Sequence, residues 1–224
     1  MTVKAAIVFK RKPGMDLDAF RSYWLNEHPK AVLKMPGLVR YCQNHPLPGG
    51  YRKGELACDG VAETWWEDME TLRRNASLPE FEALCEDEAR FIDRANMATL
   101  LVEEHVIVDG ERPGGGVKNI ELIHRKPGMA VGAFQDYWCR THGPIAAGIT
   151  QIRRYVQNHV RSGAYRDGRQ PALDGLAITW FDDTDAMRAS AASEAYATTR
   201  ADETNFLDEA RLAFVVTKEH VIKG

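Results

Sequence analysis

Two histidines at matching positions in the two halves of the chain are the residues best suited to proton transfer. His28 follows Trp24 by four positions, and His142 follows Trp138 by the same interval. This spacing predicts that each histidine shares a helix face with the tryptophan, just before a proline that interrupts the backbone hydrogen bonds. An imidazole at such a helix end can have a pKa near neutrality and act as a general acid or base. The alternative is structural, with the imidazole binding a free carbonyl at the helix break.

Polar residues alternate along one predicted strand in each half. One strand contains "RYCQNH" and the other contains "RYVQNH". Because successive side chains point to opposite faces of a strand, three hydrogen-bonding residues share one face in each half. A purely structural face would favour Val, Ile and Leu, so this pattern predicts the wall of a polar pocket. A polar seam between two sheets is the alternative and, for the histidines, so is a solvated strand end. The residues are Tyr41, Gln43 and His45 in the first half and Tyr155, Gln157 and His159 in the second.

Aromatic residues near the predicted pocket could contact a ligand. Trp65 and Trp180 lie near the end of a predicted strand and could form a flat wall on which an aromatic ligand stacks, or belong to the core. Tyr51 and Tyr165 lie in loops rich in glycine and could close over a ligand, although such loops are often mobile without binding anything.

An acidic motif, "DE..F.D", recurs late in each half and contains Asp87 and Asp202. We expect these acids to bond a neighbouring loop or cap a helix, rather than to form a catalytic dyad.

Motifs for cofactors and metals do not occur. The sequence has no GxGxxG, no Walker loop and no HExxH, and its four cysteines form no CxxC pair. We therefore expect no cofactor and no metal. The cysteines do not recur at matching positions, which favours a reducing, cytoplasmic location over a disulfide framework.

The motifs belong to an internal repeat that spans nearly the whole chain. "VKAAIVFKRKPGM" at 3–15 returns as "VKNIELIHRKPGM" at 117–129, and "DGVAETWWED" at 59–68 returns as "DGLAITWFDD" at 174–183. The offset is 114 residues up to Tyr165 and 115 from Asp174 onward. The repeat predicts two domains, 1–108 and 117–224, joined by a Gly/Pro-rich linker at 109–116.

Each half has the same predicted element order. In the first half the pattern indicates a strand at 3–10, a helix that Asp16 could cap, strands at 38–45 and 61–66, helical sequence at about 68–95, and a last strand at 98–107. In the second half, Ala130 occupies the position of the cap. The order βαββαβ is that of an α+β, ferredoxin-like unit. Two such units can bury the exposed faces of their sheets against each other, which predicts a covalent pseudo-dimer.

Each half resembles the EthD family of the dimeric α+β barrel superfamily. The resemblance lies in the ordered motifs "RKPGM", "F..YW...H", "RY.QNH", "DG.A..W" and "DE..F.D", present twice. It implies ferredoxin-like units whose sheets close an α+β barrel, with a ligand pocket between each sheet and its helices. Relatives include decarboxylases, lactone isomerases, polyketide cyclases and cofactor-free oxygenases, and more distant barrels bind haem.

The two halves differ at the histidine motif. The family sequence is His-Gly-Pro, which the second half has at His142, whereas His28 is followed directly by Pro29 and Lys30. If only one half is active, this difference favours the second.

Composition limits the partners. The chain has 224 residues and a net charge of −3, with 44% hydrophobic residues, and it carries neither a basic stripe nor an apolar run long enough to span a membrane. We therefore expect no nucleic acid or membrane partner. The expected partner is a small hydrophobic or aromatic acid, and the protein itself is either a monomeric pseudo-dimer or a homodimer.

These observations favour an enzyme of proton transfer without a cofactor. We expect a lyase or isomerase that decarboxylates, dehydrates or isomerises a small aromatic, lactone or polyketide-like acid in a catabolic or secondary-metabolite pathway. His142, with or without His28, would be the acid or base. The alternatives are an accessory protein that binds a hydrophobic metabolite without converting it and, less favoured, an oxygenase that is cofactor-free or haem-linked.

Overall fold

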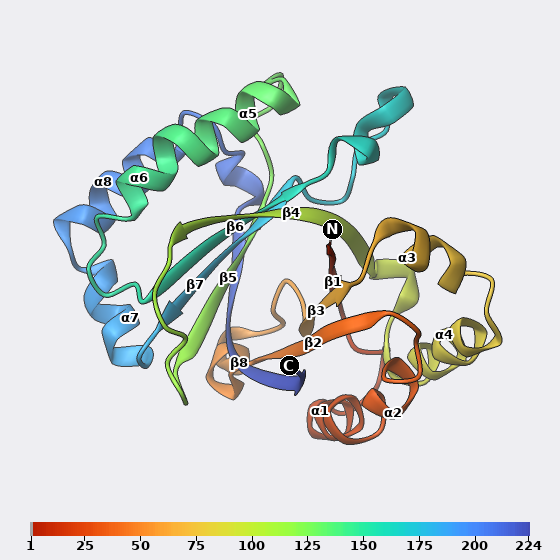
Figure 1. The fold of residues 1–224 in the computed structure, drawn as a ribbon. Helices are drawn as coiled ribbons and strands as arrows, with labels where there is room; N and C mark the ends of the chain where they lie inside the picture. The colour runs from red at the N-terminus through yellow and green to blue at the C-terminus, as the bar shows by residue number, and fades with distance from the viewer. Residues whose placement is uncertain (1) are drawn as a thin grey trace. The chain divides into compact units, whose positions relative to one another are not determined.

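The computed structural model describes residues 2–224, and it has the α+β, ferredoxin-like element order in both halves (Figure 1). The first half contains β1 (Val3–Phe9), α1 (Leu17–Asn26), α2 (Pro29–Val32), β2 (Leu38–Pro46), β3 (Gly60–Trp66), α3 (Met69–Asn75), α4 (Pro79–Phe91) and β4 (Ala98–Val108). The second contains β5 (Val117–Ile123), α5 (Val131–Tyr137), α6 (Gly143–Ala146), β6 (Arg154–Val160), β7 (Gly175–Phe181), α7 (Thr184–Ala191), α8 (Glu194–Glu203) and β8 (Ala213–Lys223). Short 3₁₀ turns lie at Pro48–Lys53, Arg94–Asn96, Ser162–Gly168 and Glu209–Arg211.

The strands are hydrogen-bonded in the order β1-β3-β2-β8-β5-β7-β6-β4, which closes as an eight-stranded barrel. The predicted fold class is therefore confirmed. Strands β4 and β8 are the longest, with 11 residues each. Among residues 2–224 no helix is long and apolar enough to cross a membrane.

Two compact units make up the chain, and their limits differ from those of the sequence repeat. One unit contains Met1–Leu101 and Glu219–Gly224, and the other contains Val102–Lys218. The difference arises at the last strand of each repeat. Residues 102–108 of β4 pair with β6 inside the second unit, and the end of β8 belongs to the first. We call these the first unit and the second unit.

The helices of the second unit cover one face of its sheet (Figure 1). The helical segment that carries His142 is irregular. Helix α5 ends at Tyr137, a π-helical turn spans Trp138–His142, and α6 begins at Gly143, whose N–H reaches back to the carbonyl of Trp138. π-helical turns inside α-helices are frequent at functional sites. In the first unit, the cap predicted at Asp16 is observed, because its carboxylate accepts bonds from the N–H groups of Asp18 and Ala19.

Trp138 packs so closely against β7 that only glycine fits beneath it. A Cβ atom on Gly175 would lie 2.6 Å from the indole ring of Trp138 and 2.5 Å from the carbonyl oxygen of Asn158. The first unit has the same arrangement, with Gly60 beneath Trp24. The glycine of the repeated "DG" motif is therefore required by the packing of a helix on the sheet.

We expect Gly175→Ala to destabilise the protein by about 1–3 kcal/mol, because the added methyl group meets both backbone and a fully buried ring. At roughly 2–4 °C per kcal/mol for a chain of this size, the loss will be visible as a lower melting temperature. The control is Gly163→Ala, where nothing lies within 4 Å of the added atom. Equal melting temperatures for the two variants would contradict the close contact.

Candidate functional site

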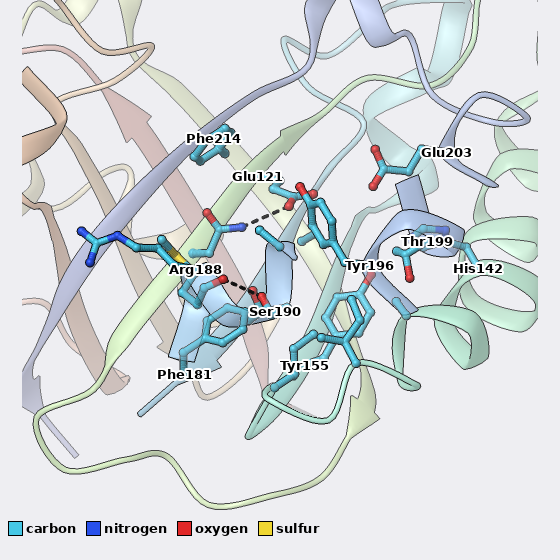
Figure 2. A pocket seen from close by; sticks show the side chains of 18 residues that line it. Glu121, His142, Tyr155, Phe181, Arg188, Ser190, Tyr196, Thr199, Glu203 and Phe214 are labelled. Carbon is cyan, nitrogen blue, oxygen red and sulfur yellow. Dashed lines mark hydrogen bonds between the residues drawn. The ribbon is translucent and has the colours of Figure 1, made fainter. Parts of the chain in front are cut away.

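A cavity of about 200 Å³ lies within the second unit, between its sheet and its helices (Figure 2). Apolar side chains make up most of its wall. One of them, Phe214, is also exposed to solvent. An engineered cavity of about 150 Å³ holds benzene, so this one has room for a single substituted ring. The lining residues are Asn119, Glu121, His142, Ala146, Ile149, Ile152, Tyr155, Ala177, Thr179, Phe181, Met187, Arg188, Ser190, Ala191, Tyr196, Thr199, Glu203 and Phe214.

His142 lines this cavity and is held from behind by a carboxylate. Its Nδ1 lies 2.9 Å from Oδ2 of Asp202 on α8. The other carboxylate oxygen, Oδ1, accepts bonds from the hydroxyl of Tyr137 at 2.6 Å and from the amide of Asn205 at 3.1 Å. The imidazole is therefore fixed in orientation by a carboxylate that is itself fixed by two further donors.

The charges of this pair settle which nitrogen carries the proton. Burial acts to raise the pKa of Asp202, but the bonds from Tyr137, His142 and Asn205 together hold that pKa below its ordinary value. An ionised carboxylate can only accept, so Nδ1 of His142 donates its proton to Asp202. Burial lowers the pKa of His142, although Asp202 opposes the shift. The side chain is thus a neutral imidazole near pH 7, with Nε2 as its proton acceptor.

Glu121 is an acid that lines the same cavity from strand β5. Burial raises the pKa of its carboxyl group, against smaller opposing effects from the charge of Arg200 and the hydrogen bond of Asn119. The amide of Asn119 donates to Oε1 of Glu121 at 3.0 Å. Since the charged form is disfavoured, this carboxyl group can retain a proton at a pH where an exposed glutamate would have lost it.

Tyr155 lines the cavity from strand β6. Its oxygen accepts hydrogen bonds from Nε2 of Gln157 at 3.1 Å and from the indole N–H of Trp138 at 3.3 Å. Burial raises the pKa of the phenol, which therefore stays protonated. Tyr155 is one of the predicted site residues, and among the residues predicted to bind substrate it is the one that lines this cavity.

Gln157 and His159 lie on the same strand face as Tyr155, but behind the cavity. The amide of Gln157 donates to the carbonyl of Trp138 at 2.8 Å, and its oxygen lies 3.0 Å from Nε2 of His159. The ring of His159 stacks on Trp138 with 4.4 Å between centroids. In this geometry these two residues hold the π-helical turn on the sheet. The first unit repeats the arrangement with Tyr41, Gln43 and His45 beneath Trp24.

The predicted aromatic wall lies elsewhere in the structure. Trp180 is outside the lining, because strand alternation places Ala177, Thr179 and Phe181 at the cavity and Trp180 on the opposite face. Its ring instead lies 4.6 Å from Nζ of Lys118. Trp65 has the equivalent contact with Lys4, also at 4.6 Å. Phe181 is therefore the aromatic residue of this strand that faces the cavity.

The two loop tyrosines also lie outside the lining. The hydroxyl of Tyr165 donates to Oδ1 of Asp174 at 2.8 Å, and that of Tyr51 donates to Asp59 at 2.7 Å. Both aspartates are bound by an arginine of the "RKPGM" motif, Arg125 and Arg11 respectively. These contacts tie the loop to the sheet rather than place a side chain over the cavity.

The first unit has the same histidine–carboxylate pair, but apolar side chains replace polar ones at some of the equivalent lining positions. Nδ1 of His28 lies 2.7 Å from Asp87. The equivalents of several cavity residues belong to a hydrophobic cluster or pack against it: Leu84 stands in place of Thr199 within the cluster, and Ile7 stands in place of Glu121 against it. Other cluster members at lining positions are Val32, Met35, Leu38, Tyr41, Ala62 and Trp66, and Leu72 packs against them. The pair occurs in both units, so it is the cavity that distinguishes the second unit.

Sequence analysis did not identify two of the residues placed at this site. Asp202 was expected to bond a neighbouring loop or cap a helix, but its side chain bonds His142. Glu121 lies outside all of the repeated motifs that indicate a site. A comparison of the two repeats could have found it, because "VKNIELI" places Asn119 and Glu121 where "VKAAIVF" has Ala5 and Ile7. An acid that replaces an apolar residue on a buried strand in one repeat alone is a signal of a local polar requirement.

Comparison with known families agrees with this architecture. The model of the EthD domain matches residues 12–95 and again residues 126–210. The chain therefore belongs to the EthD family and contains two EthD domains. No functionally curated protein matches its sequence.

Solved structures share the fold at low sequence identity. An anthrone oxidase-like protein aligns with a TM-score of 0.68 and 12% identity, covering 98% of this chain and 92% of its own. A candidate monooxygenase from Lactobacillus acidophilus NCFM aligns with a TM-score of 0.57 and 8% identity over 99% of this chain and 96% of its own. A chlorite dismutase variant from Candidatus Nitrospira defluvii aligns with a TM-score of 0.53 and 7% identity over 97% and 91%. At these identities the similarity establishes the fold alone.

The difference between the two units at this position predicts how Thr199→Leu changes stability and ligand binding. This change introduces the residue of the first unit, Leu84, at the cavity wall. We expect the free energy of unfolding to rise by about 1 kcal/mol, because apolar atoms replace empty space. Binding of a ring-sized ligand should weaken. Thermal unfolding measures the first effect, and the reverse change, Leu84→Thr, should be destabilising. A loss of stability in Thr199→Leu would contradict an open wall at this position.

The buried histidines predict that the protein becomes less stable in acid. Burial lowers the pKa of His159 to about 3, from an ordinary value of 6.5. The unfolded chain therefore binds a proton that the folded chain excludes, so this stability is complete above pH 6.5 and is lost progressively as the pH falls toward 3. One such histidine contributes a slope of up to about 1.4 kcal/mol per pH unit.

We expect His159→Gln to flatten the dependence of melting temperature on pH between 7 and 5, even though the loss of stacking on Trp138 lowers stability at pH 7. His45→Gln should behave in the same way, since burial also lowers the pKa of His45 to about 3. If the slope of melting temperature against pH is unchanged in both variants, these histidines take up protons between pH 7 and 5 in the folded protein as well.

Proposed function

We propose that this EthD protein catalyses proton transfer on a small acidic aromatic, lactone or polyketide-like compound bound in the cavity of the second unit. The reaction would be an isomerisation, dehydration or decarboxylation driven by general acid and base groups of the chain itself. The observation that carries the proposal is that a neutral imidazole, His142, and a carboxyl group of raised pKa, Glu121, line one cavity.

His142 is the proposed base. Its Nδ1 is bonded to Asp202, which leaves Nε2 as the nitrogen that can take a proton from substrate. The negative charge of Asp202 stabilises the imidazolium that then forms, as it does in other histidine–carboxylate pairs. Asp202 and Tyr137 are positioning residues in this scheme, because they act on the substrate only through His142.

Glu121 is the proposed acid. Environments that move the pKa values of two titratable groups in opposite directions are a common basis for assigning acid and base roles. Here burial lowers the pKa of the imidazole and raises that of the carboxyl group. His142 can accept a proton while Glu121 donates one, so the site gains no net charge during the transfer.

The size and lining of the cavity support a ring-sized substrate. Ile149 and Ile152 provide apolar walls. Phe181 adds an aromatic wall, and Arg188 is an exposed cation at the lining (Figure 2). A substrate with one ring and an acidic group could place the ring among the apolar residues and the acid near Arg188. Such a substrate belongs to the class of small hydrophobic or aromatic acids that the sequence predicts.

A second candidate function is cofactor-free oxygenation. Structural neighbours are named as an anthrone oxidase-like protein and a candidate monooxygenase. Loss of a proton to His142 would leave a carbanion, which is the species that reacts with oxygen in such chemistry. Consumption of dissolved oxygen during turnover would favour this function over isomerisation, and turnover with no consumption of oxygen would exclude it.

The test is exchange of carbon-bound hydrogen for deuterium, followed by nuclear magnetic resonance in D₂O, on a panel of single-ring and fused-ring probes that includes 2-indanone, cyclohexenone and phenylacetic acid. This measurement detects proton abstraction directly, whichever compound is the natural substrate. We expect exchange of at least one probe, and we expect His142→Asn to slow it by roughly 10²–10⁴-fold, the usual contribution of a general base.

The matched control is His28→Asn, because His28 has an equivalent carboxylate partner, Asp87, in the unit that has Ile7 in place of Glu121. This variant should exchange at the rate of the unmodified protein. Equal losses in the two variants would contradict assignment of the chemistry to the second unit. If tight binding of a probe persists without exchange in any variant, the protein is a binding protein and not an enzyme.

A further inference from the structure

We propose that Tyr155 and Glu121 together bind one oxygen atom of the substrate, a carbonyl oxygen that becomes an enolate when His142 removes a neighbouring proton. The substrate class is then a small cyclic or aromatic carbonyl compound with a C–H bond next to the carbonyl group. This inference rests on the proposed function and specifies the substrate group that the site recognises.

The hydroxyl group of Tyr155 is a donor toward the cavity because its acceptor capacity is already used. The side-chain nitrogen of Gln157 lies 2.8 Å from the carbonyl oxygen of Trp138, which can only accept. The amide orientation is thereby settled, and this nitrogen must also donate to Tyr155 at 3.1 Å. Trp138 supplies a second donor, its indole N–H, at 3.3 Å. Two donors occupy both lone pairs of the phenolic oxygen, so its own proton is what it can offer a ligand.

Glu121 is a second donor, provided that it is protonated. Its Oε1 accepts the amide proton of Asn119, so the acid proton is carried by Oε2. The raised pKa of this half-buried carboxyl group favours that state. With Glu121 protonated, both donors are neutral, and both residues line one cavity with His142 (Figure 2).

Two neutral donors in a site of low polarity favour an oxygen that gains charge during the reaction. They stabilise an enolate oxygen more strongly than a ground-state carbonyl, because the hydrogen bonds strengthen as negative charge develops. A tyrosine hydroxyl paired with a carboxylic acid kept neutral by its apolar surroundings is an established arrangement for this purpose. The first unit has Tyr41 at the equivalent position but Ile7 in place of Glu121, so it lacks the second donor.

The test is the binding of 4-nitrophenol, whose phenolate oxygen resembles an enolate oxygen and whose ionised form absorbs visible light. Titration of the full chain with this probe over a range of pH gives the affinity and the ionisation state of the bound phenol, without any turnover. We expect the bound probe to be more ionised than the free probe at the same pH. Tyr155→Phe should weaken binding of the ionised form roughly ten- to hundredfold, the usual effect of one hydrogen bond to a charged group.

Glu121→Gln tests the protonation state of the carboxyl group. The amide of the new glutamine is neutral and retains a donor. The affinity for the ionised probe should therefore change by less than about tenfold, which corresponds to about 1.4 kcal/mol in binding free energy. A large gain in that affinity would mean that Glu121 is ionised in the unmodified protein, which would overturn the proposal.

Three further variants complete the test. Tyr41→Phe is the matched control and should leave binding of the probe unchanged. Glu121→Leu should reduce the preference for the ionised probe, because it removes one of the two donors. His142→Asn should retain the preference for the ionised probe. Loss of the preference in this variant would mean that the phenolate binds a protonated His142 instead of the two donors. If the unmodified protein is folded, as its melting temperature will show, and binds no 4-nitrophenol at any pH, the proposal is also overturned.

The two hypotheses can fail separately. A preference for ionised 4-nitrophenol, together with no hydrogen exchange on any probe, would leave the oxygen site standing and refute the enzymatic function. Hydrogen exchange that depends on His142 but is unchanged in Tyr155→Phe would support the enzymatic function and refute the oxygen site.

Discussion

The contact between Trp138 and the sheet determines the geometry of the second unit. The indole ring lies on Gly175 and stacks on His159, its N–H bonds Tyr155, and its carbonyl accepts the amide of Gln157. One residue therefore fixes the π-helical turn that carries His142 and also orients the hydroxyl group of Tyr155. Such a buried, fully bonded network is rigid, because any displacement would leave several polar groups without partners.

The duplication has produced two units with the same framework and different interiors. Both units retain the tryptophan on glycine, the stacked histidine, and the imidazole bonded to a carboxylate. These features maintain the attachment of helix to sheet, and they persist whether or not a cavity is present. The first unit then uses Ile7 and Leu84 where the second uses Glu121 and Thr199. A packed core contributes stability, and a cavity lined by polar groups reduces it, so one repeat can stabilise the chain while the other retains a site.

Much of the fold could be predicted because the repeat supplies each pattern twice. The strand that contains "RYVQNH" places its three polar residues on one face by alternation alone, and the structure links them by hydrogen bonds through Gln157. Their division into one cavity residue and two residues that hold the helix could not be predicted. It depends on how far each lies along the strand from the π-helical turn. The same limitation applies to Trp180, since a strand pattern shows that Phe181 and Trp180 face opposite sides but not which side has the cavity.

The sequence by itself determined the duplicated α+β organisation, the family and the candidate histidines, because these depend on local periodicity and on motifs that recur in order. Only the tertiary structure decided that Asp202 is the partner of His142, 60 residues away along the chain, and that Glu121 lines the same cavity. It also located a cavity in the second unit. The physical reason is that cavities, and the pKa shifts that burial imposes, depend on the summed volume and polarity of side chains from several elements. No single segment of the sequence contains that information.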